Sequence, residues 1–450
     1  MAVVSVVKLS ELEGTKRMDA EYYQPEYMNL ISRIKNLQQV IPLRNLIREI
    51  ISGSYIDKYV EKGVLYLRVN NLTENGFDFS DVKFVDVEHS KIPQKIRVNE
   101  NDLVFGRTGT IGIAHVVPKE LDGAVMSQHI TKIVPKFTND RFYLMAYLNT
   151  KFARLQAQRV SLGSMQVELT LEGTRNLLVF YPHSLMREEI NLLISQFYES
   201  NKRSQEFYAQ AQSLFLSELG LQNFKADEKL SYEVSLSETS IAHRIDAEYF
   251  SPKYNEVIEK INKKAELKTL KEFIISVRKG VEVGAEKYQE EGIPFIRVSN
   301  LSINGFINKD QKYIAEEDYQ LLKDRFEPGK GEILLTKDAT PGISYFVKEP
   351  IKGIISSGIL RLKVKDIDPE YLCLCINSVI GKSQVERDCG GSVITHWKLN
   401  QIENLLIPIL SPETQRRIAE LVRESHEARK KAKELLEEGK KRIEKEIMCR

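Results

Sequence analysis

The chain has 450 residues, more than one hydrophobic core usually organises, so we expect two or more domains. Its 65 Lys and Arg residues nearly balance 63 Asp and Glu residues, and the net charge of +2 excludes a protein that coats nucleic acid by charge alone. A single tryptophan, Trp397, and an aromatic content of 8% give no sign of a stacking platform for single-stranded nucleic acid.

The cysteines and the first residues bear on the compartment. Cys373, Cys375, Cys389 and Cys449 lack the repeated Cys-x-x-Cys spacing of a zinc site, and we interpret them as reduced, mostly buried thiols. The run AVVSVV is too short for a spanning helix and lacks the basic start and the length of a signal peptide. We therefore expect a cytoplasmic protein without a membrane segment.

The chain repeats itself at a period near 228 residues. RMDAEYYQPEY begins at Arg17 and RIDAEYFSPKY at Arg244, which lie 227 residues apart. VLYLRVNNLTENGF then returns as IPFIRVSNLSINGF, with Arg68 opposite Arg297 at an offset of 229. Three further segments match in the same order at 228 to 230. Such constant offsets indicate a duplication, and the period is that of a whole domain with its connector.

Each copy changes pattern once along the chain. Residues 43–182, and again 270–408, hold short apolar runs rich in β-branched residues between Gly, Asn and Pro turn signals, which predicts a mostly β domain with a few helices. A long helical pattern follows each block. The first, from about Ser184 to Leu219, has 36 residues and would be roughly 54 Å long. The second begins at Ser411.

Both helical patterns carry one narrow apolar stripe at three-and-four spacing. The stripe residues are Ile190, Leu193, Ile194, Phe197, Ser204, Tyr208, Ala211 and Leu214 in the first copy, and Ile418, Leu421, Val422, Ser425, Ala432, Leu435, Ile443 and Ile447 in the second. We predict that the two helices pair as an antiparallel coiled coil. The alternative is that each helix covers its own β domain.

The predicted fold class is therefore α+β: two tandem β-rich domains, two long helices and an internal pseudo-twofold repeat. The predicted boundaries are 1–182 for the first domain, 183–220 for the first helical region, 221–410 for the second domain and 411–450 for the second helical region.

Residues for catalysis are missing from the pattern. No Pro-Pro dipeptide occurs, although amino-methyltransferases use one beside the flipped base, and Gly381-Lys382-Ser383 lacks the earlier glycine of a phosphate-binding loop. Glu332, Lys337 and Asp338 resemble a Mg²⁺ nuclease cluster, but the first copy has Asp102, Arg107 and Thr108 there. We predict neither a catalytic nor a metal site.

Polar side chains at strand ends are instead suited to reading a DNA groove, because a β scaffold presents them rigidly. A loop around 161–166, matched by 389–398, adds a third region. The alternative is that about half of these residues only cap turns. The candidates are Arg68, Asn70, Asn71, Arg107, Thr108, Ser127, Gln128, His129, Ser164 and Gln166 in the first copy, and Arg297, Ser299, Asn300, Lys337, Asp338, Ser357, Thr395, His396 and Lys398 in the second.

The two copies differ at these positions in an informative way. Arg68 and Arg297 are identical, which favours a scaffold or phosphate role. Gln128-His129 stand opposite Gly358-Ile359 in our alignment, a difference expected of residues that read sequence.

Taken in order, these features resemble the specificity subunits of type I restriction-modification systems. The resemblance rests on the paired RV.NL segments, the turns ending at Gly112 and Gly342, and the helix entry SPETQRRIAELV from Ser411 to Val422. The family commonly has Pro-Glu-Gln at that entry. This chain departs from it, with Pro412-Glu413-Thr414-Gln415 in the second copy and PHSLMREEINLLI in the first.

The resemblance implies a DNA-recognition subunit without catalysis of its own. Each domain would read one half of a bipartite, asymmetric target in double-stranded DNA, with the helices setting the spacing, about one helical turn or ~34 Å. It implies two modification (methyltransferase) subunits that bring S-adenosylmethionine, and restriction (translocase/nuclease) subunits that use ATP and Mg²⁺, all docked on the helices.

Two alternatives remain. The first is a specificity subunit of a related modification or phage-defence enzyme. The second is a two-headed scaffold that binds proteins, whose affinity would depend weakly on salt, whereas DNA binding falls steeply with ionic strength.

Overall fold

We describe a computed structural model of the chain. It describes residues 6–8, 17, 19–79, 81–86, 92–109, 111–161, 167–226, 229–308, 310–389 and 395–449. The chain forms two compact units: unit 1 is Met1–Lys202 with Arg429–Arg450, and unit 2 is Arg203–Ala428. The division falls inside both long helices, whereas the boundaries predicted from the sequence keep each helix whole and stay a prediction.

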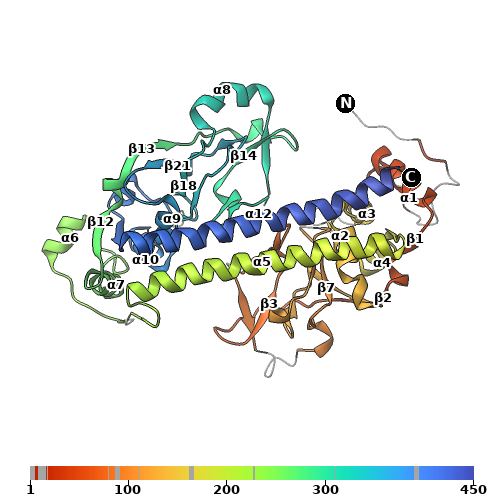
Figure 1. The fold of residues 1–450 in the computed structure, drawn as a ribbon, viewed down its shortest axis with the longest axis horizontal. Coiled ribbons are helices and arrows are strands. Elements are labelled where there is room, and N and C mark those ends of the chain that lie inside the picture. The colour runs from red at the N-terminus through yellow and green to blue at the C-terminus, as the bar shows by residue number, and fades with distance from the viewer. Residues whose placement is uncertain are drawn as a thin grey trace. The chain divides into compact units, whose positions relative to one another are not determined.

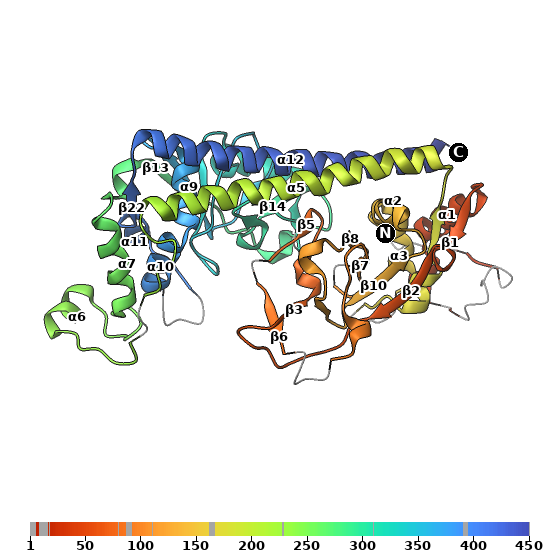
Figure 2. The same ribbon diagram turned by 60° about the horizontal axis from the view of Figure 1, so that its bottom comes forward.

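Unit 1 is built on an antiparallel four-stranded sheet in the order β2–β10–β7–β8. A second sheet has the order β6–β3–β9, with β3 antiparallel to β6 and parallel to β9. Figure 2 shows β3 and β6 on the side of unit 1 away from α5. The strands are β1 (Val40–Pro42), β2 (Ile47–Ser52), β3 (Val64–Leu67), β4 (Leu72–Thr73), β5 (Gly76–Phe77), β6 (Lys83–Val85), β7 (Leu103–Gly106), β8 (Ala114–Val116), β9 (Val125–Met126), β10 (Ile130–Pro135) and β11 (Leu178–Phe180).

Helices cover the four-stranded sheet of unit 1. Their apolar faces share one core with strands β7 and β8, including Leu103, Ala114 and Tyr143. The helices are α1 (Pro25–Asn36), α2 (Arg141–Leu148), α3 (Lys151–Val160), α4 (Leu171–Arg175) and the first part of α5 (Ser184–Glu218), joined by the last part of α12 (Pro412–Cys449).

Unit 2 repeats this plan, with the sheet orders β13–β21–β18–β19 and β17–β14–β20. The strands are β12 (Glu266–Thr269), β13 (Ile274–Lys279), β14 (Ile293–Ile296), β15 (Leu301–Ser302), β16 (Gly305–Phe306), β17 (Lys312–Ile314), β18 (Ile333–Thr336), β19 (Ser344–Phe346), β20 (Ile354–Ile355), β21 (Ile359–Val364) and β22 (Leu406–Ile409). The helices that begin in it are α6 (Leu236–Ala242), α7 (Pro252–Asn262), α8 (Glu316–Phe326), α9 (Pro369–Asn377), α10 (Val379–Cys389), α11 (Leu399–Glu403) and α12.

Buried asparagines show why the same sequence pattern gives the same fold twice. Asn149 at the end of α2 accepts a hydrogen bond from the Ala114 backbone N–H of β8 and donates to its carbonyl, at 3.3 and 2.8 Å. Asn377 at the end of α9 makes the same pair with Ser344 of β19, at 2.9 and 2.8 Å. Each side-chain amide pairs with a backbone N–H and C=O of the outermost strand, groups that no neighbouring strand pairs. The amide thereby joins the helix to the sheet.

The long helices pack against each other inside unit 1. A Cβ added to Gly439 of α12 would lie 3.2 Å from Cδ1 of Ile194 in α5, and Glu189 lies 3.6 Å from Arg442. The contacts advance along α5 from Glu189 to Ile194, whereas their partners go back along α12 from Arg442 to Gly439. The two helices are therefore antiparallel here and lie side by side, as in Figure 1. The predicted antiparallel pairing is confirmed.

The same pairing occurs inside unit 2, where the Ser204 and Ser425 hydroxyls lie 3.2 Å apart and are buried. Ser425 also donates to the Ser204 carbonyl at 2.7 Å. The stripe residues Tyr208 and Ala211 share the core of unit 2 with β18 and β21. Each helix therefore packs both on its partner helix and on a sheet. The alternative, in which each helix covers its own β domain, thus describes part of the same contacts.

Candidate nucleic-acid interface

Three loops of unit 1 meet at the end of strand β7. The Arg107 backbone N–H donates to the His129 carbonyl at 3.0 Å, and the Leu169 N–H donates to the Arg107 carbonyl at 2.9 Å. The Ser127 N–H in turn donates to Leu67 at the end of β3, at 2.9 Å. The structure thus joins the candidates Arg107 and His129 directly, and joins Ser127 to the strand end that precedes Arg68.

The corresponding loops of unit 2 meet through the same kinds of bond. The Lys337 N–H donates to the Gly358 carbonyl at 2.9 Å, and the Trp397 N–H donates to the Lys337 carbonyl at 2.8 Å. The Ser356 N–H donates to Ile296 at the end of β14, at 2.8 Å. Backbone groups make all of these bonds, and both units make them although the side chains on their loops differ.

This framework corrects our alignment of the two copies by one residue. Because Gly358 accepts from Lys337 as His129 accepts from Arg107, the structural counterparts of Gln128-His129 are Ser357-Gly358 and not Gly358-Ile359. An offset of 229 holds here, against 230 at strand β7. The chemical contrast remains: a Gln-His pair in unit 1 stands opposite a Ser-Gly pair in unit 2.

Arg107 is engaged within its own unit. Its guanidinium donates to the Ser52 hydroxyl at 2.6 Å and to the Leu169 carbonyl at 3.1 Å, and forms an ion pair with Glu168 at 2.5 Å. Its side chain is 11% exposed, whereas that of Glu168 is 51% exposed. Thr108 is buried, and its backbone forms an isolated antiparallel β-bridge with that of Glu168. The outward group at this point is therefore a carboxylate that the sequence analysis did not single out.

Glu168 was detectable in the sequence. The loop at 161–166 was matched with 389–398, and aligning Ser161 with Cys389 without a gap places Glu168 opposite His396 at an offset of 228. The β-bridges between residues 108 and 168 and between residues 338 and 396 agree with that alignment.

Unit 2 has a charged cluster at the matching place. Lys337 donates to Oδ2 of Asp338 at 2.6 Å, and Nδ1 of His396 lies 2.8 Å from Oδ1 of the same carboxylate. Burial raises the pKa of Asp338, but the hydrogen bonds from His396 and Lys337 outweigh it and hold the pKa below its ordinary value. The His396 side chain is 64% exposed.

Arg68 and Arg297 lie in a turn repeated in both units. Arg68 donates to the backbone and the carboxylate of Asp81, both at 2.7 Å, and this hydrogen bond lowers the pKa of Asp81. Arg297 pairs with Asp310 in the same way, at 3.0 Å, with the same effect on its pKa. Each guanidinium is thus neutralised within its unit, which favours the scaffold role over phosphate contact.

Asn71 and Asn300 serve these turns from inside. Each is buried, and its side-chain oxygen accepts from the backbone N–H of the preceding arginine, Arg68 or Arg297, at 2.9 and 3.1 Å. Their amides are used up by the turn, so the turn-cap interpretation fits them. Ser127 is buried as well.

The other candidates divide by exposure. Ser164 and Gln166 lie outside the described residues. Gln128 and His129 are half-buried and contact each other at 2.9 Å through their Nε2 atoms. Ser357 and Thr395 are half-buried, and Asn70, Ser299, His396 and Lys398 are exposed.

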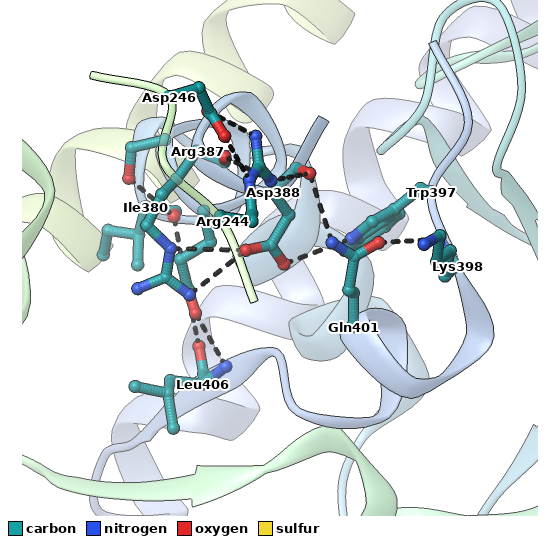
Figure 3. A network of polar contacts seen from close by, with 11 residues as sticks. Arg244, Asp246, Ile380, Arg387, Asp388, Trp397, Lys398, Gln401 and Leu406 are labelled. Carbon is teal, nitrogen blue, oxygen red and sulfur yellow. Dashed lines mark hydrogen bonds and ion pairs between the residues drawn. The ribbon is translucent and has the colours of Figure 1, made fainter. Parts of the chain in front are cut away.

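The repeated Arg-x-Asp segment braces the third loop. Arg244 pairs with Asp246 at 2.6 Å and donates to the carbonyl of Asp388 at the end of α10, at 2.7 Å (Figure 3). The Asp388 carboxylate accepts from Nε1 of Trp397 at 3.4 Å, and burial raises its pKa. In unit 1, Arg17 likewise pairs with an Asp two residues on, at 2.6 Å.

Other chemistry finds little support in the described residues. Glu332 is buried in a two-point ion pair with Arg361, at 2.7 and 3.0 Å, and not beside Asp338. Within the described ranges no group of three or more His, Cys, Asp or Glu residues could hold a metal ion. None of the helices described there is long and apolar enough to cross a membrane. The cysteines are free, three buried and Cys449 exposed.

Comparison with known proteins gives one family and several distant structures. Residues 262–437 match the family model of the type I restriction modification DNA specificity domain. No curated protein sequence matches the chain. The type I restriction-modification S subunit from M. genitalium is 13% identical with a TM-score of 0.40, over 92% of this chain and 95% of that one. The HsdS subunit from Thermoanaerobacter tengcongensis is 13% identical with a TM-score of 0.29, over 90% and 95%.

The family match covers residues 262–437, which include the charged cluster of unit 2 and the helix entry at Pro412. This part of the chain is therefore similar to the type I restriction modification DNA specificity domain, which confirms the resemblance drawn from the sequence.

Proposed function

We propose that each unit reads one half of a bipartite, asymmetric target in double-stranded DNA. The main support is that both units hold three loops together with the same backbone hydrogen bonds and yet carry different side chains on them. Hydrogen-bonding side chains on a rigid frame are what direct readout of base edges requires. Because the side chains differ, the two half-sites should differ too.

The long helices would set the spacing between the half-sites and dock two modification subunits. These two roles of the helices are supported by their length, since α5 and α12 each continue through both units as single helices of 35 and 38 residues. S-adenosylmethionine would then be bound by the modification subunits, and ATP with Mg²⁺ by restriction subunits. This chain would supply recognition and no catalytic group.

The test is methylation mapping with the full chain. We would co-purify it with the modification subunit encoded beside it and map methylation on random duplex DNA with S-adenosylmethionine. We expect a motif with two unlike halves. A complex that leaves DNA unmethylated, or the lack of any complex, would refute the proposal.

A reciprocal exchange sharpens this test. Replacing Gln128 by Ser, and Ser357 by Gln, changes side chains at matched backbone positions and leaves Gly358 in place, where a Cβ would lie 2.7 Å from Cγ2 of Val298. We expect each exchange to alter only one half of the motif. A salt titration separates DNA from peptide binding, since phosphate contacts make affinity fall steeply with ionic strength.

A further inference from the structure

The charged cluster of unit 2 is formed by Lys337, Asp338 and His396, whose side chains differ in how far they are exposed to solvent. Asp338 is 21% exposed and Lys337 18%, whereas His396 is 64% exposed. One oxygen of the Asp338 carboxylate accepts a hydrogen bond from Lys337 at 2.6 Å, and the other oxygen lies 2.8 Å from Nδ1 of His396. The histidine is therefore held by a partner that itself lies mostly below the surface.

This geometry fixes which nitrogen of His396 carries hydrogen. The hydrogen bonds from His396 and Lys337 hold the pKa of Asp338 below its ordinary value despite its burial, so the group is a carboxylate at neutral pH. A carboxylate can only accept hydrogen bonds, so Nδ1 of His396 must donate to it. Nε2 makes no hydrogen bond with the described part of the chain, and it is the ring atom left for a ligand.

The first copy lacks this arrangement although it keeps the backbone. The bridge that joins Asp338 to His396 joins Thr108 to Glu168 in unit 1. There the carboxylate lies on the opposite segment and pairs with Arg107. The backbone bonds that hold the loops are the same in both units, so the difference lies in the side chains and not in the backbone frame.

We propose that His396 contacts one base edge of the half-site read by unit 2, and that Asp338 is a positioning residue that fixes its tautomer and orientation. The inference rests on the proposed DNA-reading function and names the residues that carry it in this unit. A single oriented nitrogen addresses one base pair, whose major-groove edge offers hydrogen-bond donors and acceptors at set positions.

The experiment compares variants of the full chain in the methyltransferase complex. In His396→Ala we expect discrimination at one base pair of one half-site to fall on the order of 5- to 100-fold, with the other half unchanged. Asp338→Asn should relax the same base pair. The double variant should relax it no further than His396→Ala alone, because both changes act through one contact.

A matched control is Asp318→Asn, which breaks the exposed ion pair with Lys287 at 2.7 Å elsewhere in unit 2 and should leave the motif intact. His396→Gln serves as a second variant in case the alanine variant does not assemble.

The outcomes separate this inference from the proposed function. If the unaltered complex yields no two-part motif, the proposed function fails. If it yields one and His396→Ala leaves that motif unchanged, only the inference about His396 fails. A loss of methylation that is equal at all target variants would indicate a phosphate contact, and would overturn base contact.

Discussion

His115 of strand β8 gives unit 1 a defined pH dependence of stability. It is buried, with Nε2 2.6 Å from the Thr73 carbonyl, Nδ1 3.5 Å from the Tyr198 hydroxyl and its ring against Phe77. Burial lowers its pKa from 6.5 to about 4. The folded unit therefore holds a neutral imidazole where β8, the β4–β5 hairpin and α5 meet.

The sign follows from proton binding. Below pH 6.5 the unfolded chain binds a proton at His115, while the folded unit does not until about pH 4. The stabilisation is therefore complete above pH 6.5 and is lost as the pH falls towards 4. At about 1.4 kcal/mol per pKa unit, the free energy of unfolding should fall by about 2 kcal/mol from pH 7 to pH 5 and by about 3 kcal/mol by pH 4.

Hydrogen exchange of residues 114–116, corrected for intrinsic rates, measures this loss in unit 1. The fluorescence of Trp397, which lies in unit 2, serves as the internal reference. His115→Gln is the matched control, since its amide can still donate to Thr73 but does not titrate. We expect the pH slope between 6.5 and 4 to be flatter in the variant by the amount given above. Equal slopes in both proteins would refute the reasoning.

Three further predictions concern other contacts. Arg361→Ala leaves Glu332 buried without its partner and should destabilise unit 2 by about 3–5 kcal/mol, measured by urea unfolding with Trp397 fluorescence. Ser425→Ala should cost about 1–2 kcal/mol in the same assay, and the double variant with Ser204→Ala less than twice that, because the two hydroxyls satisfy each other. Gln128→Ala should relax only the half-site that unit 1 reads, which methylation mapping would report as one changed half.

The sequence predicted the architecture well because its signals are periodic and repeated. The first long helix was expected from about Ser184 to Leu219 and spans Ser184–Glu218. Stripe positions such as Phe197 and Ile443 are fully buried. Burial of an apolar stripe follows from spacing alone, so no knowledge of the tertiary partner was needed.

The candidate interface was less predictable because its contacts join segments that are distant in the chain. Arg107 has the chemistry of a DNA ligand, and only the fold shows that Glu168 and Ser52 hold it. Asn71 looks like an adenine reader in sequence, but the turn consumes its amide. The exposure of a side chain also depends on packing. His396 and Gln128 both lie in loops that are held by the same backbone hydrogen bonds in the two units, yet His396 is exposed and Gln128 is half-buried.

The duplicated units suggest how specificity can change without loss of the fold. Side chains that hold one element to another recur in both copies: Gln156 bonds both backbone groups of Leu178, and Gln384 those of Leu406, at 2.8 to 3.0 Å. The three loops of the candidate interface are joined to the frame by the same backbone N–H and C=O groups in both copies, while side-chain bonds such as that from Arg107 to the Leu169 carbonyl differ between the copies. A substitution at Gln128 therefore removes no bond on which the loop framework depends. The internal amides are bound to specific partners, and changing them would leave buried backbone groups unpaired, at a cost of about 1–3 kcal/mol each. This difference explains why the two copies agree inside and diverge at the loops, and why exchanging loop side chains should alter the target before it alters stability.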